Sequence, residues 1–341
     1  MNNLIKYFIL IFIYLSCFLL SCKREPEKAY RMIKDTEIKM MKYIDVSIMR
    51  YDKDLFNINK GDMKNELKGL QNSYRFFLDA DLEDEQNIIQ MQSYLNDALI
   101  QSLQEDVMKK YPDLTFLELQ LTGAFRRIKV LLPDFEIPVV YTYISGGDFE
   151  FPVRYADNVL LIALDMYLDS DYSIYQNIWG IPDFISYRMR KESIIIDCVK
   201  VIGRAFLEKT QSKQTALLDR MIYEGKILYF ADLCLPNIHD SIKISYTTRQ
   251  INWSEAYQDK VWSFFVEQDL LYSKDIRTNS NFLNDAPFTS TFSRESPPRL
   301  GNYIGWQIVR QFMLNNPNVT IEELFELSNS TNILQAARYR P

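Results

Sequence analysis

The sequence predicts an α+β protein that is mostly helical and has a small central sheet. Apolar residues recur at helical spacing in both halves, as in Leu117, Leu121, Phe125 and Ile128, and this is the pattern of an amphipathic helix. The period changes in the middle of the chain, where residues 139–144 are β-branched and aromatic, as in strands. Gly (10) and Pro (12) are sparse among the 341 residues, so few long linkers are expected.

Helices are predicted before the sheet over residues 61–110, and again from residue 114. In the first region a single apolar stripe is formed by Met91, Leu95, Leu99, Leu103 and Val107. The second region runs to Leu132, with Asp113 as its candidate N-cap and Pro133 as its stop. Asp is a favoured N-cap residue, and Pro cannot continue a helix.

The predicted sheet draws on segments from two parts of the chain. Residues 45–51 alternate apolar and polar, as a half-buried strand does. Residues 139–144 form a second strand, and Gly146-Gly147 marks the turn after it. Residues 154–164 supply one further extended run. It is apolar throughout from Val159, which predicts an interior strand covered on both faces.

The second half of the chain is predicted to be helical. Four buried helical segments are expected at residues 194–206, 217–228, 257–265 and 304–312. A capping box at Thr320 and Glu323 predicts the start of a last helix. The sequence contains no fixed-period repeat, which disfavours a solenoid.

The start of the chain resembles a bacterial lipoprotein signal. Lys6 precedes the apolar run Tyr7–Ser21, which ends in a lipobox-like Leu-Leu-Ser-Cys with the cysteine at Cys22. The predicted organisation is a signal peptide over residues 1–21, a tether over 22–43 with lipid on Cys22, and a single α+β domain over 44–341. An ordinary cleaved signal and an uncleaved anchor are the alternatives. More than one acyl chain gives stable membrane anchoring.

Composition and missing motifs exclude the common catalytic classes. The net charge is −6 with no long basic stretch, which argues against nucleic-acid binding. The only histidine, His239, lies in a loop-like stretch, so an H-E-x-x-H zinc motif is absent. No cofactor and no metal are therefore expected. Cys198 and Cys234 remain after the signal, and two separate buried thiols are favoured over a disulfide.

Three segments resemble the gliding-motility lipoprotein family GldB of the Bacteroidota. They are residues 159–168, 221–230 and 295–310, read together with the lipobox. The resemblance implies a lipid-anchored cell-envelope protein at the outer membrane. The run Lys23–Lys28 does not match the acidic export signal of surface lipoproteins in this phylum, which favours the periplasmic face. The protein would support gliding motility and/or the associated type IX secretion machinery as a non-catalytic accessory component. Its partners would be the membrane, through the anchor, and other envelope or gliding and secretion proteins.

A fainter resemblance concerns residues 221–230, which are similar to the downstream glutamate motif of certain zinc peptidases. It implies a zincin-like fold that has lost its metal, with Asp197 and Glu224 as a candidate degenerate site. The alternative function is therefore a lipid-anchored hydrolase with an altered metallopeptidase-like site around Glu224. The structural alternatives are a solvated or capping carboxylate at Glu224 and close helix packing at Gly225.

The segment from Arg299 to Trp306 is a candidate partner or packing motif. Gly301 and Gly305 lie four residues apart, so both belong to one helix face. They allow close approach of another backbone, either in a docking groove or within the core, and internal packing is favoured. Trp306 is an amphipathic residue that anchors partners in some interfaces, although it is more often part of the core. Arg299 and Arg310 are expected to be solvated.

Overall fold

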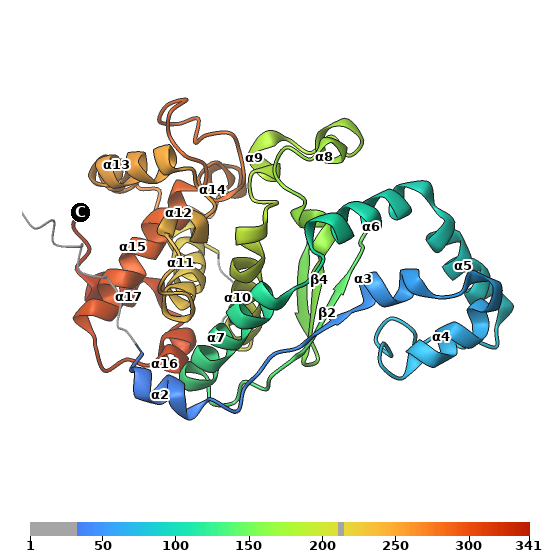
Figure 1. Ribbon diagram of the computed structural model, residues 1–341. Helices are drawn as coiled ribbons and strands as arrows, with labels where there is room; N and C mark the ends of the chain where they lie inside the picture. Colours follow the sequence, from blue (N-terminus) through green and yellow to red (C-terminus); the bar gives the residue numbers. More distant parts are fainter. Residues whose placement is uncertain (1–32, 211–214) are drawn as a thin grey trace, which may run out of the picture.

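The computed structural model describes residues 33–210 and 215–341. The predicted signal peptide, the lipidation site at Cys22 and the first part of the tether lie outside the described residues. The predicted α+β class is confirmed, since helices surround a small mixed sheet (Figure 1). Among the described residues, no helix combines the length and apolarity needed to cross a bilayer.

The sheet has four strands within the described residues, in the order β1-β2-β4-β3. Their bounds are β1 (Ile48–Arg50), β2 (Val139–Tyr143), β3 (Val153–Ala156) and β4 (Val159–Ala163). β1, β2 and β4 run parallel, and β3 pairs with β4 antiparallel at the edge. The apolar β4 is an interior strand, as predicted.

The prediction of one extended run over residues 154–164 is wrong. The run is a hairpin that turns at Asp157 and Asn158, which have φ values of 49° and 58°. Such left-handed conformations at both central residues give a turn whose twist matches paired strands, and Asp and Asn tolerate them well. The turn makes β3 an antiparallel edge strand.

The helices before β2, of which all but α2 follow β1, differ from the prediction in their boundaries. They are α2 (Asp35–Met40), α3 (Tyr51–Asp54), α4 (Met63–Gln71), α5 (Glu85–Asn96), α6 (Ala98–Lys110) and α7 (Thr115–Leu131). The predicted continuous stripe over 91–107 is broken at Asp97, whose carboxylate accepts from the N–H groups of Leu99 and Ile100 and so caps α6. Asp113 is not the N-cap of α7, because Leu114 holds that position.

The helices after the sheet are α8 (Ser173–Asn177), α9 (Asp183–Ser186), α10 (Lys191–Glu208), α11 (Leu217–Cys234), α12 (Asp240–Lys243), α13 (Thr248–Glu267), α14 (Ile276–Leu283), α15 (Leu300–Asn315), α16 (Ile321–Glu326) and α17 (Ser330–Ala337). Of these, α10, α11, α13 and α15 correspond to the four predicted segments, whereas α8, α9, α12, α14 and α17 were not predicted. The capping box at Thr320 and Glu323 is present at the start of α16, but α16 is not the last helix as predicted, because α17 follows it.

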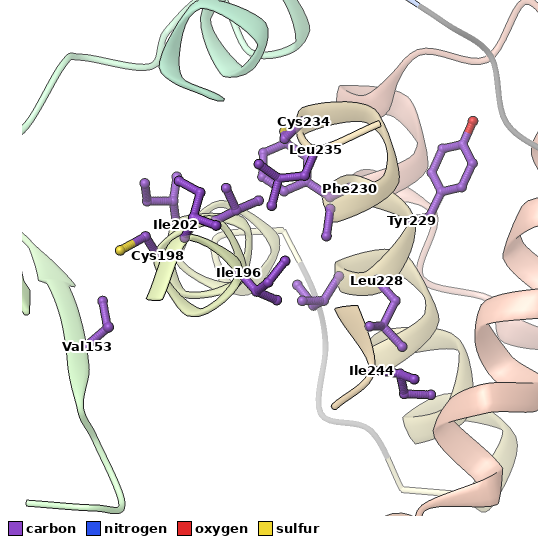
Figure 2. Close-up of a cluster of buried hydrophobic side chains, with 14 of the residues drawn as sticks. Val153, Ile196, Cys198, Ile202, Leu228, Tyr229, Phe230, Cys234, Leu235 and Ile244 are labelled. Carbon is purple, nitrogen blue, oxygen red and sulfur yellow. The ribbon is translucent and has the colours of Figure 1, made fainter. Parts of the chain in front are cut away.

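Apolar side chains cover both faces of the sheet. α10, α11 and α15 lie on one side of it and α4 and α5 on the other (Figure 1). Figure 2 shows Val153 of β3 across from Cys198 of α10. Cys234 lies on α11, and both cysteines are buried free thiols. The predicted pair of separate thiols is therefore present.

Glycines bring α11 and α15 into direct backbone contact. A Cβ added at Gly305 would overlap the carbonyl of Met221, and one added at Gly225 would overlap the carbonyl of Gly305. Gly301 is less tightly enclosed, since a Cβ there would lie 2.9 Å from the Leu283 side chain and 3.0 Å from the Phe282 carbonyl. The backbone that meets Gly225 and Gly305 is thus the chain's own, so these two glycines serve close packing between α11 and α15.

A buried ion-pair network joins the same two helices. Asp232 of α11 pairs with Arg310 of α15 at 2.7 Å and with Lys243 of α12 at 2.8 Å. It also accepts a hydrogen bond of 2.9 Å from the indole of Trp306. Trp306 is fully buried, so it is no partner anchor. The expectation of a solvated Arg310 is wrong too, because its guanidinium also pairs with Asp240 at 2.7 Å.

Candidate functional site

Two adjoining hollows beside β3 form one cleft, which we call the charged cleft. Their volumes are about 750 Å³ and about 410 Å³. Both are lined by Arg188, Arg204, Glu224, Arg299 and Asn302. The smaller hollow also contacts β3 and Asp197. The structure therefore brings the two predicted site residues, Asp197 and Glu224, to the same cleft.

Glu224 is held in a two-point ion pair with Arg204. The guanidinium donates to both carboxylate oxygens, at 2.7 Å and 2.9 Å. Arg204 comes from α10 and Glu224 from α11, so the pair joins two neighbouring helices. The structural alternative assumed that Glu224 is a solvated or a capping carboxylate. It is neither, because both of its oxygens accept from Arg204. Such forked contacts are strong and fix the geometry of both groups.

Asp197 lies one turn before Lys200 on the same helix, and it is partly buried. It accepts a hydrogen bond of 2.8 Å from the hydroxyl of Tyr167. Burial raises the pKa of Asp197 above its ordinary value, against opposing effects of Lys200 and Tyr167. Among the described residues, no group of three or more His, Cys, Asp or Glu side chains is placed to hold a metal ion.

Lys200 lines the cleft without a hydrogen bond or close ion pair to any residue in the described ranges. Burial lowers its pKa to about 8, although Asp197 partly opposes the shift. Since the pKa in the unfolded chain is about 10.5, the unfolded state binds more protons between these two values. The contribution of Lys200 to the free energy of unfolding therefore increases as pH rises from about 8 to about 10.5.

We expect Lys200→Met to stabilise the protein at pH 7, because it removes a poorly solvated cation while keeping the apolar stem. It should also remove a slope of at most about 1.4 kcal/mol per pH unit from the pH dependence of unfolding above pH 8. Urea unfolding of both proteins from pH 7 to 10 measures the difference, in which the contributions of all other groups cancel. Parallel curves for the two proteins would contradict the assignment.

Arginines gather at one end of the cleft, around Asp285. The carboxylate of Asp285 lies 2.9 Å from Arg188 and 3.2 Å from Arg299. Arg220 lines the same hollow, and no ion pair joins it to a described residue. Arg299 is the N-cap of α15 and has a left-handed φ of 53°. A non-glycine residue in this conformation is uncommon and costs energy, and such residues cluster at functional sites.

Sequence reasoning missed most of these residues. Asp197, Lys200 and Arg204 are spaced i, i+3, i+7 on α10, so one polar stripe on an otherwise apolar helix predicts their shared face. For Arg188, Arg220 and Asp285 the sequence carries no such signal, because they come from separate segments joined only by the tertiary fold. His239 is exposed, accepts the N–H of Ser241 at the start of α12, and does not line the cleft.

Comparisons with known proteins agree with the resemblance noted in the sequence. A model of the lipoprotein family described as gliding motility protein GldB matches residues 32–341. No curated protein and no solved structure matches the chain. The match covers most of the chain, including the last part of the predicted tether and every element that lines the charged cleft. The chain therefore belongs to the GldB family of gliding-motility lipoproteins.

Proposed function

We propose that the protein is a non-catalytic binding component of the cell envelope that supports gliding motility and/or the associated type IX secretion machinery. Lipid on Cys22 would hold it at the outer membrane, facing the periplasm. The charged cleft would receive a partner protein. Membership of the GldB family supports the link to motility, and the ion-paired state of Glu224 and Asp285 supports binding rather than catalysis.

The carrying observation is that arginines already engage Glu224 and Asp285. A general base needs a free, basic lone pair, and a zinc ligand must point its lone pair at the metal. In the Arg204–Glu224 pair both carboxylate oxygens already accept from the guanidinium, so their lone pairs are directed at Arg204 rather than at a substrate proton or a metal. Fixed, mutually paired charges instead suit selective recognition of a charged surface.

A lipid-anchored hydrolase with an altered metallopeptidase-like site remains the second candidate. The observation in its favour is that Asp197 and Glu224 lie on adjacent helices and line one cleft. The two candidates differ in whether the Glu224 carboxylate is chemically required.

Glu224→Gln separates these candidates, because it removes the carboxylate while keeping the size of the side chain. We expect the full-length lipoprotein, purified in detergent without chelator, to show the same metal content by mass spectrometry with and without this change. Peptide hydrolysis should stay at background in both proteins. Near-stoichiometric metal and hydrolysis that are both lost in Glu224→Gln would overturn the binding proposal in favour of the hydrolase.

Whether a partner protein occupies the cleft is tested with a photo-crosslinking amino acid, p-benzoylphenylalanine, incorporated into the protein in a gliding host. Tyr223 lines the cleft, whereas Tyr257 is an exposed residue outside it. Placed at position 223, the cross-linker should give a discrete adduct with an envelope protein that is absent from position 257. A gliding cell that yields no adduct at position 223 would contradict a partner in the cleft.

A further inference from the structure

We infer that the arginine end of the charged cleft, formed by Arg188, Arg220 and Arg299, binds a carboxylate of an extended acidic peptide segment. This inference rests on the proposed function and names the chemistry of the partner. It is carried by the charge of the hollow and, within the described residues, by a buried amide oxygen without a hydrogen-bond partner at its wall and by a strand edge without a strand partner along its continuation.

The larger hollow has an excess of positive charge. The described residues that line it include four arginines but only two carboxylates, Glu224 and Asp285. The chain as a whole has a net charge of −6, so this hollow differs in sign from the molecule around it. A concave surface of one sign focuses the field and attracts oppositely charged ligands.

The internal pairing leaves room for one more carboxylate at this end. Glu224 is matched by Arg204, whereas Asp285 alone lies between Arg188 and Arg299. Arg220 adds a guanidinium without an ion pair among the described residues. Guanidinium groups favour carboxylates because two N–H donors match two oxygens. A ligand carboxylate would therefore be bound by groups that the fold already holds in place.

Asn302 indicates that the ligand also carries amide groups. It lines both hollows and is only 9% exposed, and its side-chain oxygen is buried without a hydrogen-bond partner. Its nitrogen makes one long contact, 3.5 Å to the carbonyl of Leu283. A buried acceptor left unpaired is costly. A peptide N–H would satisfy this oxygen, and if the two amide atoms were exchanged, a peptide carbonyl would serve equally well.

The cleft continues along β3, which favours an extended chain over a small anion. Within the described sheet, β3 pairs with β4 alone and leaves its other edge open. Val153 and Tyr155 of β3 line the smaller hollow. An open strand edge binds extended peptides through main-chain hydrogen bonds. Glu150 and Glu208 also line this hollow, so the acidic residue of the peptide belongs at the arginine end.

Selection from a random peptide library tests the inference on the full-length lipoprotein in detergent. Peptides selected by the wild-type protein should be enriched in Asp and Glu relative to the unselected library. Arg220→Gln should weaken the best of them about tenfold or more, since it removes a charge-assisted contact. Arg249→Gln is the matched control, because Arg249 is exposed and does not line the cleft. It should leave affinity unchanged.

Three results would overturn the inference. They are a selection without acidic enrichment or without any binder, equal affinity in Arg220→Gln and wild type, and displacement of the peptide by inorganic phosphate at a concentration near the peptide's own Kd. Failure here is distinguishable from failure of the proposed function. An adduct from position 223 that does not depend on Arg220 would leave the binding role standing and overturn only the acidic-peptide class.

Discussion

Gly305→Ala is expected to destabilise the protein by about 3 kcal/mol or more, or to prevent folding. The added methyl group would overlap the backbone of Met221, and a backbone cannot move aside as a flexible side chain can. Relief would require α11 and α15 to separate. Both helices belong to the main core, so their separation would loosen the packing around them. Urea unfolding followed by circular dichroism measures the loss.

Gly123→Ala is the matched control for this prediction. Gly123 lies within α7, and nothing is within 4 Å of a Cβ added there. The same chemical change should therefore stabilise the protein by up to about 1 kcal/mol, through helix propensity alone. Similar effects of the two substitutions would show that the helix contact is less close than the structure has it.

Asp232→Ala is expected to cost about 3–5 kcal/mol. The carboxylate is fully buried, as is the Lys243 side chain paired with it, and the side chain of Arg310 is only 8% exposed. Removing Asp232 takes from both cations their most deeply buried anionic partner, whereas the Asp240 carboxylate, which also pairs with each of them, is partly exposed. It also leaves the indole N–H of Trp306 without this acceptor. The midpoint of urea unfolding at pH 7 reports the effect.

Glu295→Ala is the control, because it also removes a carboxylate paired with an arginine. The Glu295–Arg249 pair is exposed on both sides, so water and salt replace it readily. No measurable change in stability is expected. If Asp232→Ala behaved in the same way, the buried network would not contribute as its burial implies.

Periodicity predicted most of the fold, since side-chain spacing reports directly on which face of an element is buried. The interior position of β4 followed from its unbroken apolar run, and α10, α11, α13 and α15 followed from their apolar stripes. Two errors in element boundaries arose where an Asp or Asn side chain ends an element although the apolar spacing continues past it. Asp97 ends one helix and caps the next, and Asp157 with Asn158 turns a strand back on itself.

The candidate site was less accessible to sequence reasoning. Asp197 and Glu224 entered through a family resemblance, and the structure does bring them to one cleft. Their partners could not be predicted, because an ion pair such as Arg204–Glu224 depends on how two helices pack. For Trp306 the sequence left a partner anchor and a core position open, and its complete burial with a hydrogen bond to Asp232 shows the core position. Local sequence patterns do not indicate which side chains from distant segments will contact one another.

The glycine contact between α11 and α15 has a consequence for how ligands are selected. Gly225 follows Glu224 directly, and Gly305 lies one turn after Asn302, so the contact sets the spacing between two walls of the cleft. Helices whose backbones are already in contact cannot approach further. The cleft walls formed by α11 and α15 therefore cannot close around a small ligand. We expect the free and occupied cleft to have nearly the same shape, with association limited by encounter and orientation rather than by a closing motion.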